Sequence, residues 1–199
     1  MTGDSGRRDA AIAGHRGDEN TARALLSHAD AATRGSALAA LARMGRLAPN
    51  DLGAALADSD AAVRRRACQV AAAVDGPDVV AALLERLADG DDAVVEMAAW
   101  ALGERGDGCD TTVVALASVA GGHGDALCRE AAVAALGAIG APAGLPAILA
   151  ATTDKAAVRR RAVLALAPFE GPEVEAALQR ALEDRDWQVR QAAEDLLAP

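Results

Sequence analysis

The heptapeptide AAVRRRA occurs twice in this 199-residue chain, at 61–67 and again at 156–162. Its first copy lies in the longer segment DAAVRRRACQVAAAVDGPDVVAALLERLAD, residues 60–89. An apolar or small residue, Val63 in this copy, anchors a pattern that returns every 30 to 34 residues. A fixed interval of this length is the sequence signature of a repeat architecture. The six anchors are Thr33, Val63, Val94, Cys128, Val158 and Val189.

Several positions around each anchor keep their residue type. An aspartate stands three residues before five of the six anchors, and an arginine stands one residue after five of them, with Lys155 and Val95 as the exceptions. The residue eight after the anchor is leucine everywhere but at Ala71, and the residue four after is always alanine. Anchor, +4 and +8 positions share one face of a helix with 3.6 residues per turn, so each copy predicts an amphipathic helix. Its aspartate can cap the first backbone N–H groups and lies four residues before the arginine, where an acid–base pair stabilises a helix.

A shorter apolar-periodic segment precedes each of these helices and is joined to it by a polar turn. Glycine, proline and acidic residues mark the junctions between copies, as in VDGPD at 74–78 and FEGPE at 169–173. The repeating unit is therefore a helix, a turn and a second helix, about 31 residues long. Six such units predict an all-α solenoid in which each repeat buries its apolar stripe against its neighbours.

These residues resemble a known family. The segments at 60–89 and at 129–152, REAAVAALGAIGAPAGLPAILAAT, are similar to HEAT-like repeats, in particular the short bacterial kind of phycobilisome bilin lyases. The resemblance covers about 18–197 and implies a right-handed alpha solenoid of about six HEAT-like helical hairpins. It also implies that the arginines after the anchors join neighbouring repeats into a ladder. It says little about function, because scaffolds, enzymes and regulators share such repeats.

The pattern also predicts how the chain is divided. We expect a disordered N-terminus at 1–6 and a single HEAT-like repeat domain at 7–199, with a partial capping helix at 8–16 that covers the first repeat. The repeats are expected at roughly 18–45, 46–75, 76–107, 108–140, 141–170 and 171–199.

Composition narrows the classes of function. The net charge of −9 and the pI of about 4.8 disfavour a nucleic-acid-binding surface, which depends on clustered positive charge. No apolar run approaches the length of a membrane span, and three widely spaced cysteines without a CxxC pair suggest reduced thiols. We expect a cytoplasmic protein that does not contact membranes. The preference for arginine over lysine, with abundant alanine and glycine, suggests a bacterial source.

The three consecutive arginines do not form one patch. Successive residues of a helix project about 100° apart, so Arg64, Arg65 and Arg66 point in three directions. We interpret the first arginine of each run as a structural residue. Arg65 and its counterpart Arg160 point away from the buried stripe and are candidates for ligand contact.

Function is expected on the outward ridge, the positions two and six residues after each anchor, because the second helices of such stacks usually line the concave surface. At these positions Glu96 and Glu130 are flanked by the two outward arginines, and Trp100 stands beside Glu96. Trp100 is either a binding anchor or a filler of the groove between repeats. Trp187, in the last polar turn, is expected to cover the end of the stack. The candidate partner-binding residues are Trp100, Glu96, Glu130, Arg65, Arg160 and Gln69.

Chemistry at the thiols is the competing hypothesis. His123, Asp125 and Cys128 form an H-x-D-x-x-C pattern, but Asp125 is expected to cap a helix and Cys128 to be buried at an anchor position. The sequence therefore predicts no metal and no cofactor.

We favour a noncatalytic protein–protein interaction or scaffold module whose protein or peptide partner carries basic groups that match the acids. The alternatives are an enzyme or enzyme subunit related to bilin lyases, with Cys128 or Cys109 as nucleophile beside His123, and a nucleic-acid-binding protein that uses Arg65 and Arg160.

Overall fold

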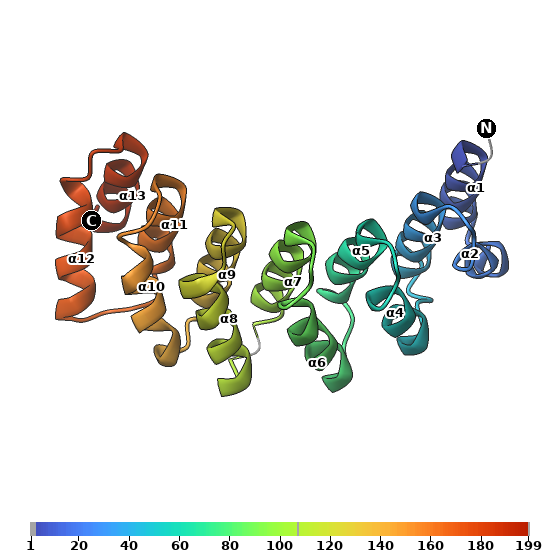
Figure 1. Cartoon of the computed structure of the whole chain (residues 1–199), viewed down its shortest axis with the longest axis horizontal. Coiled ribbons are helices and arrows are strands. Elements are labelled where there is room, and N and C mark those ends of the chain that lie inside the picture. Colours follow the sequence, from blue (N-terminus) through green and yellow to red (C-terminus); the bar gives the residue numbers. More distant parts are fainter. Residues whose placement is uncertain (1–2, 107, 199) are drawn as a thin grey trace. The chain divides into compact units, whose positions relative to one another are not determined.

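A computed structural model describes residues 3–106 and 108–198, and these residues contain thirteen α-helices, one 3-10 helix and no strand (Figure 1). The predicted all-α class is confirmed. The chain divides into two compact units, Met1–Val94 and Val95–Pro199, which are described separately. The boundary falls within one helix, and the expected single repeat domain at 7–199 stays a prediction.

The first unit is built on three long helices that pack side by side. The second helices of its repeats, α3 and α5, are neighbours, and α1 packs on the other side of α3 (Figure 1). The first helices of the repeats, α2 and α4, pack against α3 and α5 respectively. The helices of this unit are α1 (Gly3–Arg16), α2 (Glu19–Leu25), α3 (Ala31–Arg43), α4 (Pro49–Leu56), α5 (Ala61–Ala71) and α6 (Pro77–Arg86).

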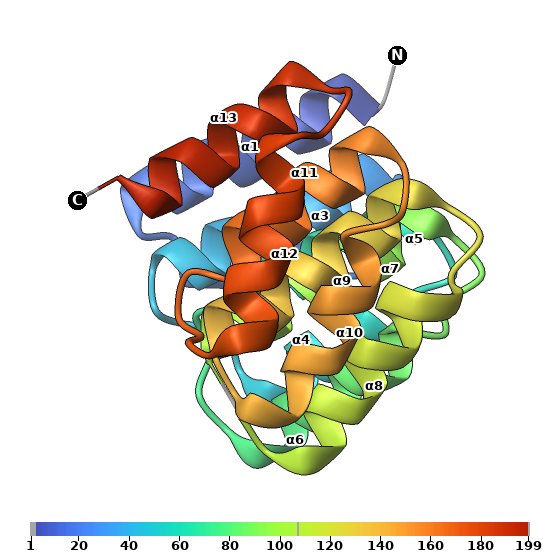
Figure 2. The ribbon, with the colours of Figure 1, turned by 90° about the vertical axis from the view of Figure 1, so that its left-hand side faces the viewer.

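The second unit continues the same pattern. Its second helices α9, α11 and α13 pack in that order, while α8 packs on α9 and α10, and α12 on α13. The last hairpin, α12 and α13, faces the viewer in Figure 2. The elements are α7 (Asp92–Arg105), whose first turn belongs to the first unit, α8 (Asp110–Gly122), α9 (Ala126–Ile139), the 3-10 helix η1 (Pro142–Gly144), α10 (Leu145–Ala151), α11 (Ala156–Ala165), α12 (Pro172–Leu182) and α13 (Trp187–Leu197).

The N-terminal helix is longer than expected. A partial helix was expected at 8–16 and disorder at 1–6, whereas α1 begins at Gly3 and includes Gly6. Met1 and Thr2 lie outside the described residues. Because α1 packs on α3 as α3 packs on α5, it occupies the place of the second helix of a repeat.

Aspartates begin the second helices as predicted. The side chain of Asp30 accepts a hydrogen bond from the backbone N–H of Thr33 at 2.9 Å, and Asp125 accepts one from Leu127 at 2.7 Å. Asp60, Asp91 and Asp186 accept equivalent bonds from the residue two positions later, at 2.9 to 3.0 Å. Each bond satisfies a donor that the helix itself leaves unpaired, so these residues set where α3, α5, α9 and α13 begin.

The apolar stripe lies in the core. All six alanines four residues after the anchors have no exposed surface, and the anchors themselves are at most 2% exposed. Small residues let α9 and α11 approach closely, since a Cβ on Gly137 would lie 2.7 Å from the Cα of Ala165. Leu197 is the exception among the leucines eight after the anchor: it is 40% exposed because no repeat follows it in the structure.

A ladder of ion pairs joins the turns of successive repeats, as the family resemblance implied. The partner of each ladder arginine is not the capping aspartate four residues before it. It is an aspartate in the turn of the next repeat. The Nε and Nη2 atoms of Arg159 donate to the two carboxylate oxygens of Asp184 at 2.8 and 2.7 Å. Three other pairs have the same two-bond geometry, at 2.6 to 2.8 Å: Arg34–Asp58, Arg64–Asp89 and Arg129–Asp154.

Each ladder arginine also holds its own turn. The Nη1 atom of Arg64 donates to the backbone carbonyls of Asp58 and Ser59, and that of Arg159 to the carbonyl of Asp154. The acceptor aspartate is fixed in turn, because Asp184 also accepts the backbone N–H of Asp186 at 2.8 Å. The guanidinium of Arg159 therefore ties its own turn, at Asp154, to the next turn, where Asp184 lies 25 residues after the arginine.

The three arginines of the first AAVRRRA segment have different surroundings. Arg64 is a ladder residue, Arg66 donates to Gln69 at 2.6 Å, and Arg65 is exposed. The prediction that a run in sequence is not one patch in space is confirmed.

The ladder changes at one position of the second unit. Val95 occupies the place of the arginine in α7 and is fully buried, and His123 occupies the place of the acceptor aspartate in the next turn. The Nδ1 atom of His123 accepts the N–H of Asp125 at 3.1 Å, as the aspartates do for their own turns. At this step of the ladder both the arginine and the acceptor aspartate are replaced. Neither charged residue is therefore left buried without the other.

Replacement of Asp184 by Asn should destabilise the second unit by about 2 kcal/mol, because the largely buried guanidinium of Arg159 loses its charged acceptor. Urea unfolding followed by circular dichroism measures this loss. The matched control is Glu183→Gln, which removes an exposed acid next to it and should change the free energy of unfolding by less than about 0.5 kcal/mol. Equal stability of the two variants would contradict a structural role for the ladder.

Stability should also fall with acid. The arginine partners lower the pKa of Asp58, Asp89, Asp154 and Asp184 through their hydrogen bonds. A lowered folded-state pKa adds stability above the unfolded value of about 3.9 and loses it as pH falls through the folded value. The free energy of unfolding should therefore fall below about pH 4, and the difference between wild type and Asp184→Asn should shrink there. A difference that stays constant from pH 7 to pH 3 would refute this linkage.

Candidate functional site

Two of the predicted residues, Glu96 and Trp100, lie on α7 in the outward ridge of the second unit. Trp100 is 40% exposed, although the other large apolar residues of its helix are buried or, at Met97, half-buried. Glu96 is half-buried one turn before it and forms no ion pair within residues 3–106 and 108–198. An indole and a carboxylate are therefore presented together by adjacent turns of one helix.

Glu130, the second predicted acid, has a partner within the fold. Its Oε1 atom accepts hydrogen bonds from Nε and Nη2 of Arg161 on α11, both at 3.3 Å. The carboxylate is half-buried and its charge is offset by this guanidinium. Glu130 thus connects α9 to α11, and of the two predicted acids Glu96 has the less compensated charge.

Arg65 and Gln69 belong to the first unit, where both are exposed on α5. Gln69 accepts a hydrogen bond from Arg66 within the same helix. These two residues form a separate candidate surface, because the two units are described independently.

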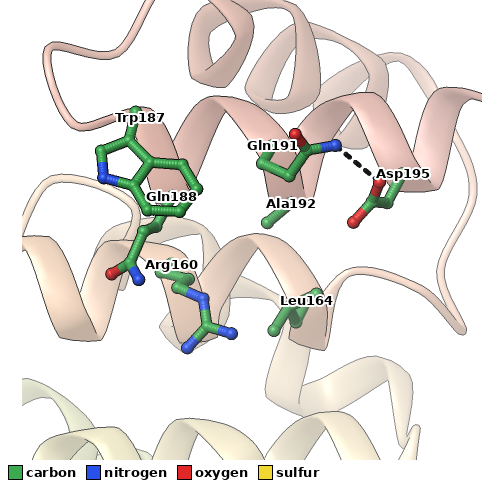
Figure 3. Close-up of a pocket in the computed structure, with 7 residues that line it drawn as sticks. All are labelled: Arg160, Leu164, Trp187, Gln188, Gln191, Ala192 and Asp195. Carbon is green, nitrogen blue, oxygen red and sulfur yellow. Dashed lines mark hydrogen bonds between the residues drawn. The ribbon is translucent and has the colours of Figure 1, made fainter.

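Arg160, the remaining predicted residue, lies at a hollow between α11 and α13 of the second unit (Figure 3). The hollow has a volume of about 120 Å³. Its wall combines a cation, an indole, aliphatic groups and amides. The lining residues are Arg160, Leu164, Trp187, Gln188, Gln191, Ala192 and Asp195.

The two ends of the hollow differ in chemistry. Figure 3 shows Trp187, Gln188 and Arg160 towards one end, and the pair Gln191–Asp195 towards the other. The amide of Gln191 donates to the carboxylate of Asp195 at 2.9 Å. Arg160 is exposed and forms no ion pair or hydrogen bond within the part of the chain that the structure describes.

Sequence reasoning did not include Trp187 among the site residues. It was expected to cover the end of the stack, but it is 64% exposed and lines the hollow instead. The missed signal was its position two residues before the anchor, where the other repeats have alanine or, once, Asp92. A large ring where the repeat otherwise needs only a small or polar residue is a departure that packing does not explain.

Two of the three thiols are buried, and His123 has hydrogen-bond partners within the fold. Cys68 and Cys128 are fully buried, and burial raises the pKa of the Cys68 thiol to about 12. His123 accepts the N–H of Asp125, and its carbonyl accepts a hydrogen bond from Arg129 at 2.8 Å. Asp125 caps α9 as expected. Cys109 is exposed at the start of α8, with its sulfur 3.2 Å from the hydroxyl of Thr112.

None of the helices in the described part of the chain has both the length and the apolar character needed to cross a membrane. No curated protein matches the sequence.

Several solved structures have a similar fold. YibA of E. coli has a TM-score of 0.67 at 17% identity, over 92% of this chain and 73% of that one. An engineered protein has a TM-score of 0.65 at 24% identity, over 90% and 97% of the two chains. A designed armadillo repeat protein in complex with the peptide (KR)4 has a TM-score of 0.60 at 16% identity, over 99% and 98%. At these identities the likeness shows the fold, and it confirms the predicted helical solenoid.

Family models agree with the repeat pattern. The model for HEAT repeats matches residues 19–103, 49–121 and 96–167, which together span most of the chain. The model for the PBS lyase HEAT-like repeat matches 158–184, which includes most of α11, all of α12 and both residues of the ladder pair Arg159–Asp184. With its helical hairpins, its buried alanines and its arginine ladder, the chain belongs to the family of HEAT-like repeat proteins.

Proposed function

We propose that this protein is a noncatalytic interaction module that binds a protein or peptide partner on the outward ridge of α7, α9, α11 and α13. The observation that carries the proposal is the exposure of both tryptophans in a chain with only 2% aromatic residues. Trp100 on this ridge is 40% exposed, and Trp187, which lines a hollow beside the ridge residues Arg160 and Gln191, is 64% exposed. Exposed indoles are common anchors of protein interfaces, because they bury a large area at little entropic cost. The HEAT-like fold provides a preformed surface for such anchors.

The surface around Trp100 suits a partner with basic groups. Glu96 lies one turn away on the same helix without an ion pair among the described residues, so its carboxylate can accept hydrogen bonds from a lysine or arginine of the partner. Glu130 adds negative charge to the next helix, although Arg161 offsets it. The similar designed armadillo protein, which holds the peptide (KR)4, supports the idea that a solenoid can hold a basic segment. Arg65 and Gln69 would make separate contacts on the first unit.

The proposed setting is the bacterial cytoplasm. The three cysteines form no disulfide and two of them are buried, an arrangement that suits a reducing compartment.

Replacing Trp100 by Ala should weaken the partner complex by about tenfold, the loss expected when an aromatic anchor is truncated. The partner is first identified by affinity purification from the native host, then purified and titrated by calorimetry. Val114→Ala, which truncates a 66% exposed side chain on α8, is the matched control and should bind as wild type does. If both variants retain wild-type affinity, Trp100 is not part of the binding surface.

A noncatalytic role predicts that no thiol acts as an activated nucleophile. Iodoacetamide at pH 7.5 should modify only Cys109 in the native protein, because Cys68 and Cys128 have no exposed surface. All three thiols should react in denaturant. Mass spectrometry of time points measures the extent of modification. Rapid modification of Cys128 in the folded protein would revive the hypothesis of an enzyme that uses Cys128 and His123.

A further inference from the structure

We propose that the hollow between α11 and α13 binds the carboxylate of an acidic side chain that is flanked by apolar residues in a peptide segment of the partner. The inference rests on the proposed function and adds a second subsite, of opposite charge to the surface around Trp100. Arg160 would hold the carboxylate, and Trp187 would cover the adjacent apolar side chain (Figure 3).

At the hollow, a contact of the preceding repeat has no counterpart. One repeat earlier, Glu130, two residues after its anchor, meets Arg161, three residues after the next anchor. The same pair of positions one repeat later holds Arg160 and Ala192, and both line the hollow. Arg160 has taken the place of the acid, while Ala192 has only a methyl group, which cannot pair with a guanidinium. The guanidinium is therefore left without the intramolecular partner that this position has in the preceding repeat.

The positive charge of Arg160 favours an anion at one end of the hollow. Arg160 forms no ion pair or hydrogen bond with the described residues, so its planar fork of donors is available to a carboxylate in two-bond geometry. Asp195 lies towards the other end, where Gln191 already donates to one of its oxygens. Its remaining acceptor capacity suits the backbone N–H groups of a bound peptide rather than a second carboxylate.

The apolar surface and the volume fix the size of the occupant. Trp187 is 64% exposed, and Leu164 is half-buried on the opposite helix. Covering such a ring with an aliphatic side chain removes apolar area from water on both partners. The volume of about 120 Å³ suits a small group such as one side chain. A short acidic peptide with leucine neighbours has the charge and shape that these walls require.

The two tryptophans make the test specific, because the chain contains no others. In a ¹⁵N-labelled protein the two indole N–H signals are assigned with Trp100→Phe and Trp187→Phe. The probes are the tripeptides N-acetyl-Leu-Glu-Leu-amide, its Gln analogue and its Lys analogue, each titrated at low salt. We expect the Glu peptide to shift the Trp187 signal saturably, and the Gln and Lys peptides to bind roughly fivefold more weakly or not at all.

Two variants examine the residues themselves. Arg160→Gln should weaken binding of the Glu peptide by roughly fivefold, whereas Arg180→Gln, which removes an exposed charge from α12, should leave it unchanged. Ala192→Glu should abolish the response, because its carboxylate would pair with Arg160 and fill the hollow in a charge-reversed copy of the Glu130–Arg161 contact. Thermal unfolding of each variant confirms that it is folded.

The proposal is overturned if the Trp187 signal responds equally to the Glu and Gln peptides, if the Lys peptide binds more tightly, or if Arg160→Gln and Ala192→Glu bind as wild type does. Failure of the proposed function has a different signature, since it is judged by the effect of Trp100→Ala on the partner complex. The Trp100 signal, which should stay unmoved by the Glu peptide, separates the two results within one titration.

Discussion

The repeats depend on one interaction, the two-bond contact between an arginine of one turn and an aspartate of the next. Four arginines each donate hydrogen bonds to such an aspartate and also to at least one backbone carbonyl oxygen of their own turn. They are Arg34, Arg64, Arg129 and Arg159. Apolar packing alone would let neighbouring hairpins slide, because alanine-rich faces offer few large knobs. Charged groups with fixed geometry remove that freedom. Because the charges are largely buried, a missing partner is costly, so donor and acceptor have to be kept or replaced together.

The candidate site lies where exposed positions outside the ladder differ in residue type from the same positions in the other repeats. Trp100 and Trp187 stand where most repeats have small or polar residues. The alanine four residues after the anchor stays fully buried in both α7 and α13, so the helices keep their packing while the exposed residues change. A rigid spacing of helices with free choice of outward residues is what lets a HEAT-like fold present different surfaces.

Much of the architecture could be predicted from the sequence, because the interval of about 31 residues, the alanine four after each anchor and the capping aspartates are local signals. The ladder partner could not: the offset from Arg159 to Asp184 becomes visible only when the turns are placed beside one another. The hollow was missed for the same reason, since Arg160, Trp187 and Ala192 become neighbours only through the stacking of α11 on α13. Likewise, Glu130 looked like an open acid until Arg161 was found to contact it.

The pairing of turn with turn has a consequence for how such a chain can change length. Each ladder arginine needs only some aspartate in the following turn, so a whole hairpin excised or duplicated at equivalent points leaves every guanidinium matched. Val95 and His123 break this interchangeability, because a crossover between them would join an arginine to a histidine or a valine to an aspartate. The codons of Val95 and His123 are therefore expected to be inherited together. Recombination between them would leave a charged ladder residue without its oppositely charged partner.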